Sequence, residues 1–328
     1  MRTSTMPRAG LTVSAIGLGT WQLGADWGEV GAADAHAVLD AAASSGVTFF
    51  DTADVYGDGR SEAMIGGYLA DHPDAGIVVA TKMGRRVDQL PENYTLENFR
   101  AWTDRSRRNL RMDTLDLVQL HCPPTAVYSI DRVFDDLDTL VADGAIARYG
   151  VSVEKTSEAL AAIARPGVAT VQIILNAFRL KPLDEVLPAA VEAGVGIIAR
   201  VPLASGLLSG RYTEQTDFAA NDHRNFNRHG EAFDVGETFS GVDYARGVEA
   251  AREFAALARE HGLEPSTAAI AWTSQLAGVG TVIPGARTAA QARANAESGA
   301  VAPLGPEFTT RVTELYGRYF RASVHPRW

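Results

Sequence analysis

Four side chains that can exchange protons accompany three apolar, strand-like runs of the sequence. Asp51 ends the run FFD, and Tyr56 lies on the stretch that follows it. Lys82 ends the run VVATK, and His121 ends the run LVQLH. A carboxylate, a phenol, an ammonium and an imidazole suit the delivery of a proton to a carbonyl oxygen if the fold brings them together. Their spacing matches neither a nucleophilic triad nor a set of metal ligands, so we expect no metal site.

The chemistry gives each group a separate role. A tyrosine with an ordinary pKa of about 10 is a weak acid-base catalyst at neutral pH unless a cation favours its phenolate. Lys82 can supply that cation, and Asp51 can hold the lysine. His121 can hydrogen-bond the substrate oxygen while Tyr56 delivers the proton. Because no side chain provides a hydride, the reaction requires a cofactor.

Each of these residues also has a structural explanation. Asp51 can cap the turn after it, Tyr56 can be an ordinary loop aromatic, and a lone His121 is more often a satisfied core histidine than a catalyst. Four such groups at successive strand ends favour the catalytic interpretation. Lys82 is the least ambiguous, because a buried ammonium requires a partner and only three of the 30 basic residues are lysines.

The elements that position these groups alternate along the chain. Eight strands are predicted at Ala15–Gly19, Val47–Asp51, Ile77–Lys82, Asp116–His121, Tyr149–Ser152, Val171–Leu175, Val195–Val201 and Gly280–Pro284. Helices are predicted at Ala32–Ser45, Ser61–Leu69, Leu96–Leu110, Ile130–Asp143, Thr156–Ala164, Leu183–Glu192, Gly247–His261 with Ser266–Leu276, and Ala289–Ser298. Eight parallel strands, each followed by a helix, predict an α/β fold, a single (β/α)8 TIM barrel over residues 1–328. Its active site would lie at the carboxyl ends of the strands.

A doubly wound sheet is the alternative fold, because Gly17 and Gly19 follow a strand as in a dinucleotide-binding fingerprint. However, Gln22 occupies the position of the third glycine, and Trp21 would crowd a phosphate turn. The sequence therefore favours the barrel.

Composition limits the partners. The 328 residues carry a net charge of −10 and no long basic run, so we expect neither nucleic acid nor a membrane surface as partner. The single cysteine, Cys122, excludes an internal disulfide and a thiolate zinc cluster and agrees with a cytoplasmic location. The first ten residues lack the apolar stretch of a secretory signal. The long uncharged run from Pro265 to Ala286 is interpreted as a buried helix and strand.

The sequence resembles the aldo-keto reductases along nearly its whole length. Seven motifs occur in the order typical of that family: GLGTW at 17–21, FDTADVYGDGRSE at 50–62, TK at 81–82, DLVQLH at 116–121, GVS at 150–152, PLASGLLSGRY at 202–212 and VIPGAR at 282–287. The resemblance implies that Asp51, Tyr56, Lys82 and His121 are catalytic. It also implies that hydride passes from C4 of a reduced nicotinamide to an aldehyde or ketone as the tyrosine gives up its proton.

The same resemblance implies an NADP(H) site. The expected contacts are Gly19, Thr20 and Trp21 of the first motif, Ser152, Gln172 and Arg200 at the nicotinamide, Leu203 and Ser205 at the pyrophosphate, and Gly285, Arg287, Gln291, Arg293 and Asn295 at the adenosine half. Barrels often build phosphate sites from their last two strand-to-helix loops, which agrees with this placement. Arg287, with Arg293 as an additional candidate, is expected to bind the 2′-phosphate.

Two positions depart from the family pattern. Val153 stands where many members have an asparagine, and Arg200 stands where many have an aromatic residue that stacks on the nicotinamide. A guanidinium plane can also stack on the ring.

The long irregular stretch from Leu207 to Asp243 is expected over the active-site mouth. Six arginines are interpreted as a solvated face: Arg85, Arg86, Arg105, Arg107, Arg108 and Arg111.

Three hypotheses about function follow. The favoured one is an NADP-dependent oxidoreductase that reduces small aldehydes or ketones to alcohols. The alternatives are an NAD-dependent sugar or polyol dehydrogenase of the same fold, and a non-catalytic regulatory subunit that senses nicotinamide. Turnover of a carbonyl panel separates a catalyst from a sensor. No oligomeric state is predicted.

Overall fold

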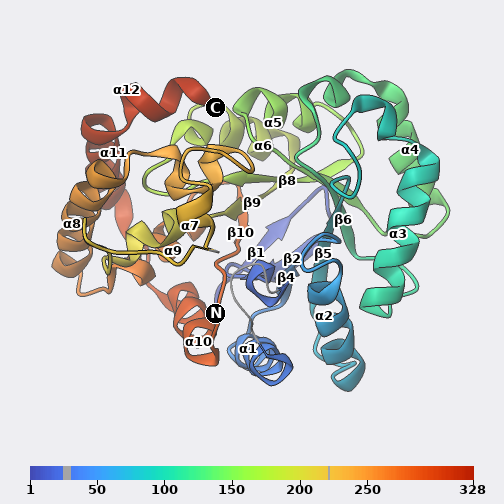
Figure 1. Ribbon diagram of the computed structural model, residues 1–328, viewed down its shortest axis with the longest axis horizontal. Helices are drawn as coiled ribbons and strands as arrows, with labels where there is room; N and C mark the ends of the chain where they lie inside the picture. Colours follow the sequence, from blue (N-terminus) through green and yellow to red (C-terminus); the bar gives the residue numbers. More distant parts are fainter. Residues whose placement is uncertain (25–30, 221) are drawn as a thin grey trace.

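Eight parallel strands close into a barrel in the structure, a computed structural model that describes residues 1–24, 31–220 and 222–328 (Figure 1). The strands pair in chain order: β3 (Leu18–Gly19), β4 (Phe49–Asp51), β5 (Val78–Met83), β6 (Leu117–His121), β7 (Tyr149–Ser152), β8 (Val168–Ile174), β9 (Gly196–Arg200) and β10 (Val279–Val282). Parallel bridges from Ile16 to Val282 and from Gly19 to Gly285 join the first and last strands. The predicted (β/α)8 barrel is confirmed.

Helices follow the strands around the barrel (Figure 1). They are α1 (Ala32–Ser44), α2 (Arg60–Asp71), α3 (Leu96–Leu110), α4 (Asp131–Ala142), α5 (Thr156–Ile163), α6 (Val186–Ala193), α8 (Tyr244–Glu260) with α9 (Pro265–Ser274), and α10 (Ala289–Glu297). In α3 the cap residue Thr95 accepts a hydrogen bond from the Asn98 amide, and Arg111 ends the helix in a left-handed conformation. No helix of the described ranges is long and apolar enough to cross a membrane.

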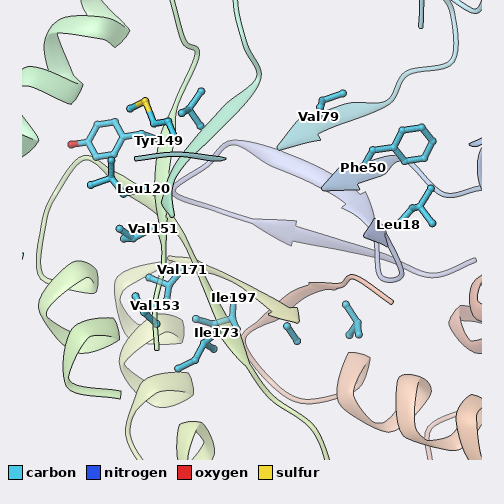
Figure 2. Close-up of a cluster of buried hydrophobic side chains, with 14 of the residues drawn as sticks. Leu18, Phe50, Val79, Leu120, Tyr149, Val151, Val153, Val171, Ile173 and Ile197 are labelled. Carbon is cyan, nitrogen blue, oxygen red and sulfur yellow. The ribbon is translucent and has the colours of Figure 1, made fainter. Parts of the chain in front are cut away.

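Side chains alternate between the barrel interior and the surrounding helices. On β4, Phe49 packs with the interior cluster, whereas Phe50 packs in the outer core between strands and helices. Figure 2 shows Phe50 in this outer cluster beside Leu18 and Val79 of the neighbouring strands. The same period of two turns Asp51 inward, because it lies two residues after Phe49. The position of a residue along a barrel strand, odd or even, therefore decides whether its side chain points into the barrel.

A hairpin that the sequence did not predict packs against the barrel interior. Strand β1 (Thr3–Met6) pairs antiparallel with β2 (Leu11–Ser14). Met6 belongs to the interior cluster, and a Cβ on Gly196 or Gly280 would lie 2.3 Å or 2.6 Å from its side chain. The two glycines thus leave the space that the Met6 side chain fills between β9 and β10.

The remaining differences concern boundaries and the carboxyl-terminal part of the chain. The first predicted strand is shorter than expected, at Leu18–Gly19, and β8 begins at Val168 rather than at residue 171. Helices α11 (Gly305–Tyr319) and α12 (Arg321–Val324) were not predicted. Helix α11 packs on α8 and adds a second hydrophobic cluster beside the barrel.

Candidate active site

Asp51, Tyr56, Lys82 and His121 lie together at the carboxyl ends of β4, β5 and β6. Lys82 Nζ lies 2.5 Å from Asp51 Oδ1 and 3.4 Å from the Tyr56 hydroxyl oxygen. It also donates to the Thr52 carbonyl at 2.8 Å. The rings of Tyr56 and His121 meet edge to face, with centroids 6.0 Å apart. The structure therefore brings together the four residues that the sequence singled out.

Both oxygens of the Asp51 carboxylate are occupied. While Oδ1 faces Lys82, Oδ2 accepts hydrogen bonds from Gln172 Nε2 at 2.7 Å and Gln119 Nε2 at 3.4 Å. A buried ion pair is tolerated when its other lone pairs are satisfied in this way. Asp51 therefore anchors the lysine, and one amide hydrogen of Gln172 is committed to the anchor.

Burial decides the protonation states of Tyr56 and His121. It raises the pKa of the Tyr56 phenol, and the neighbouring Lys82 ammonium opposes that rise. The phenol is therefore protonated at neutral pH, which suits a proton donor. Burial also lowers the pKa of His121 well below its usual range, and the Arg85 guanidinium adds to this effect. A neutral imidazole can still donate one hydrogen bond to a carbonyl oxygen.

The turn after β4 fixes the phenol. Gly57 has a φ of 58°, and a Cβ at this position would lie 2.0 Å from the Gly24 carbonyl oxygen. On the other side, Trp21 stacks on the Tyr56 ring with centroids 6.1 Å apart and planes 23° apart. Glycine is thus required immediately after Tyr56, and Trp21 limits the movement of its ring.

A cavity of about 560 Å³ opens at this end of the barrel. Three of the four central residues line it, Asp51, Tyr56 and His121, whereas Lys82 is buried. The other predicted residues that line it are Gly19, Thr20, Trp21, Ser152, Gln172, Arg200, Leu203, Ser205, Gly285, Arg287, Gln291 and Asn295. Arg293 is exposed and is not part of the lining. Its assignment to the 2′-phosphate stays a prediction without support from this placement.

Backbone strain is concentrated directly after β9. Val201, Ala204 and Ser205 have positive φ values of 55°, 47° and 54°, which residues with a Cβ rarely adopt. Asn176 supports the turn by donating to the Val201 carbonyl at 2.9 Å and to Ser240 Oγ at 2.7 Å. Strained, supported turns of this kind are typical of ligand-binding loops. The position fits a loop that contacts a pyrophosphate.

The loop before α10 and the helix itself contribute Arg287, Gln291 and Asn295 to the same cavity. Gln291 Oε1 accepts the Arg287 amide hydrogen at 2.8 Å, and Asn295 Nδ2 donates to the Gly285 carbonyl at 3.1 Å. Within the described ranges, the Arg287 guanidinium has no hydrogen-bond or ion-pair partner. A helix amino terminus beside an available guanidinium favours a phosphate. These donors fit the phosphate-bearing half of a dinucleotide.

A sequence model described as the Aldo/keto reductase family matches residues 15–317. The chain belongs to the aldo/keto reductase family. It is an NAD(P)H-dependent oxidoreductase. Small carbonyl compounds and a nicotinamide cofactor are the ligands of this family, which agrees with the cavity and its polar lining.

Relatives of this aldo/keto reductase cover most of its length. A Mycobacterium tuberculosis protein described as an uncharacterized oxidoreductase is 31% identical over 290 residues, which are 86% of this chain and 83% of the relative. The glycerol dehydrogenase of Gluconobacter oxydans is 28% identical, with a TM-score of 0.81 over 97% of this chain and 95% of that chain. An aldo-keto reductase of Klebsiella pneumoniae in complex with NADPH shares the fold, at 23% identity, with a TM-score of 0.71 over 96% and 95%.

In this aldo/keto reductase, Arg200 is held by a buried group of charges. Its guanidinium pairs with Glu237, lies 3.4 Å from a Glu154 carboxylate oxygen and donates to the Val153 carbonyl at 3.0 Å. Burial by itself lowers the pKa of Arg200, but the nearby carboxylates of Glu237 and Glu154 raise this pKa above its ordinary value. Arg200 therefore lines the cavity as a fixed cation.

The long stretch from Leu207 to Asp243 contributes to the cavity mouth, in agreement with its expected location. Its short helix α7 spans His223–Phe226. Its cavity-lining residues are Ser209, Arg211, Tyr212, His223, Arg224, Phe233 and Glu237. Ser205 Oγ donates to the Glu237 carbonyl at 2.9 Å and accepts the Phe239 amide at 3.0 Å. The second part of this stretch is therefore fixed to the strained turn after β9.

One interpretation of the sequence is wrong. Arg85 was assigned to a solvated face, but it lines the cavity of this aldo/keto reductase. Its Nε donates to the His121 carbonyl at 3.1 Å. Its position, three residues after Lys82, was the available signal, because loops after barrel strands form the active-site rim. Nothing in the local sequence indicated Glu237, which reaches the cavity only through the fold of the long stretch.

Within the described part of the chain, no group of three or more His, Cys, Asp or Glu side chains is arranged to hold a metal ion.

Proposed function

We propose that this aldo/keto reductase reduces an aldehyde or ketone to the alcohol with NADPH. The observation that carries the proposal is the buried series of contacts from Asp51 through Lys82 to the Tyr56 hydroxyl, which ends at the cavity wall beside His121. These contacts support the proposal because a protonated phenol at the cavity wall can give its proton to a carbonyl oxygen bound there. The proposed substrate is a small carbonyl compound or a sugar in its carbonyl form.

The side chains divide the work of proton transfer. Bound NADPH supplies the hydride. Tyr56 donates its proton to the carbonyl oxygen, and Lys82 stabilises the phenolate that is left. Asp51 holds the ammonium in place. His121 remains neutral and donates a hydrogen bond to the same oxygen, which orients the carbonyl for the hydride.

The cofactor would be held by three regions of the cavity wall. Ser152, together with the remaining polar atoms of Gln172, binds the carboxamide of the nicotinamide. The strained turn with Ser205 contacts the pyrophosphate, and Arg287 binds the 2′-phosphate. The last contact is the basis for proposing NADPH rather than NADH.

A titration and a substrate panel test the proposal. The protein is titrated separately with NADPH and NADH, and a set of aldehydes, ketones and sugars is then screened for loss of the reduced-nicotinamide absorbance. We expect NADPH to be oxidised only when a carbonyl compound is present, and the kcat/KM for NADPH to exceed that for NADH. Preference for NADH, with sugar or polyol oxidation by NAD⁺, would establish the dehydrogenase alternative. Tight cofactor binding without turnover of any compound would establish the sensor alternative.

A further inference from the structure

The cavity contains a guanidinium beside the proton-donating groups that the proposed chemistry does not use. We infer that Arg85 binds a carboxylate of the substrate, so that the substrate is an oxo acid: an aldehyde or ketone with a carboxylate on the same small molecule. This inference rests on the proposed carbonyl reduction and names the substrate class of that same site.

Arg85 is held in place next to the carbonyl-orienting residue. Its Nε donates to the backbone carbonyl of His121 at 3.1 Å, and the Gln89 side-chain amide donates to the same oxygen at 3.2 Å. The Arg85 side chain is 28% exposed and shares the cavity with Tyr56 and His121. The guanidinium is therefore both positioned and accessible from the cavity.

The terminal nitrogens of Arg85 are available to a ligand. Nη2 lies 3.5 Å from Glu154 Oε1, which is longer than an ordinary N–H···O hydrogen bond. The other Glu154 oxygen faces Arg200, which also pairs with Glu237. Glu154 thus lies between the two guanidinium groups, with one oxygen toward each, whereas Glu237 pairs with Arg200. A carboxylate that approaches the end of the Arg85 guanidinium can accept two parallel hydrogen bonds.

Two other cations near the Tyr56 phenol, Lys82 and Arg200, already have close carboxylate partners. Lys82 is buried against Asp51, and Arg200 is paired with its glutamates. Trp21 stacks on Tyr56, and Phe233 contacts the Trp21 ring, so this side of the cavity is aromatic. A carbonyl held at Tyr56 therefore has an aromatic wall on one side and Arg85 as the cation available to an attached carboxylate.

Matched substrates test this inference. The kcat and KM of the whole enzyme with NADPH are measured for 4-oxobutanoate and for its methyl ester, which keeps the aldehyde and the chain but lacks the charge. The variants are Arg85→Gln, Arg85→Lys and the control Arg100→Gln. Arg100 is a half-exposed residue of α3 that pairs with Asp143, so its replacement removes the same charge away from the cavity.

The expected result is a difference in KM. The wild type should prefer the acid over the ester by about tenfold or more in kcat/KM. Arg85→Gln should raise the KM for the acid by roughly 10- to 100-fold and change the KM for the ester by less than about twofold. Arg85→Lys should retain part of the preference, since it keeps the charge but not the paired donors. Arg100→Gln should match the wild type with both substrates.

A binding measurement separates recognition from turnover. Calorimetry of succinate binding to the complex with NADP⁺ should show weaker binding in Arg85→Gln by the same factor as the KM change. Equal loss for the acid and the ester would show that Arg85 only positions His121, and no preference in the wild type would also overturn the inference. Failure to reduce any carbonyl, charged or neutral, would instead overturn the proposed function on which the inference rests.

Discussion

Lys82 and Asp51 form a fully buried ion pair, with Nζ 2.5 Å from Oδ1. Replacing a buried pair with apolar residues is often neutral for stability, whereas removing one partner leaves a buried charge unpaired. The ion pair is therefore not expected to make the protein much more stable than apolar residues would. Its position places an ammonium 3.4 Å from the Tyr56 hydroxyl oxygen, where it can stabilise a phenolate.

Replacing Tyr56 with Phe should remove the proton donor and keep the stacking on Trp21. We expect kcat to fall by about 10²- to 10⁴-fold, with the dissociation constant for NADPH nearly unchanged. Single-turnover kinetics and a fluorescence titration with NADPH measure the two quantities. Near-normal turnover would show that another group is the acid.

Lys82→Met should reduce turnover almost as much, and Lys82→Arg should not restore it. The ammonium fits between a carboxylate and a backbone carbonyl, at 2.5 Å from Asp51 and 2.8 Å from Thr52, and a planar guanidinium is too wide for that space. Measuring kcat for both variants, with circular dichroism to verify folding, tests this. An active, folded Lys82→Arg enzyme would contradict the assigned role.

Gly57→Ala should impair catalysis through the backbone. The positive φ and the 2.0 Å approach to the Gly24 carbonyl oxygen leave no room for a Cβ, so the turn must shift and carry Tyr56 with it. We expect a loss of at least about tenfold in kcat. Gly67 of α2 is the matched control, since a Cβ there would meet nothing within 4 Å. Gly67→Ala should keep normal kcat, and equal losses in both variants would refute the explanation.

Arg287→Ala should raise the KM for NADPH by roughly tenfold or more and leave the KM for NADH and kcat nearly unchanged. The reason is that the two cofactors differ only in the 2′-phosphate, and the exposed Arg287 guanidinium lines the cavity at the start of α10. Arg293→Ala should have a smaller effect, because Arg293 lies outside the cavity lining. Equal weakening of both cofactors by Arg287→Ala would show that this residue does not read the phosphate.

Asp54 should make stability depend on pH. It is fully buried, neither carboxylate oxygen has a partner of good geometry among the described residues, and burial, with Glu62 adding, raises its pKa to about 7. Because the folded pKa exceeds the unfolded value of about 4, the folded state loses stability as the pH rises between these values. Asp54→Asn should therefore raise the free energy of unfolding by roughly 1–3 kcal/mol at pH 8 and change it little at pH 4. Urea denaturation at both pH values measures this, and a gain of the same size at pH 4 would exclude titration of Asp54 as the cause.

The barrel could be predicted because its signals are local. All eight predicted strands begin and end within about three residues of those observed, because apolar runs and the helices between them can be recognised in short stretches of sequence. The hairpin β1–β2 was missed for the opposite reason, because its position depends on distant residues, whereas helix α11 carries a local amphipathic pattern that the prediction left out. The place of Met6 depends on the space left by Gly196 and Gly280, which are far away in the sequence.

The sequence by itself determined that Asp51, Lys82 and His121 meet inside one rim of the barrel, because strand-end residues of a parallel barrel lie at the same end and strand alternation turns these three inward. Only the tertiary structure decided how those groups are charged and what surrounds them. Burial, which has no local signal, keeps the Tyr56 phenol protonated although Lys82 favours its phenolate. The pairing of Arg200 with Glu237 likewise depends on the long stretch from Leu207 to Asp243 folding back over the barrel. Such a contact is set by the path of the chain, and the residues next to Arg200 or Glu237 in the sequence carry no signal for it.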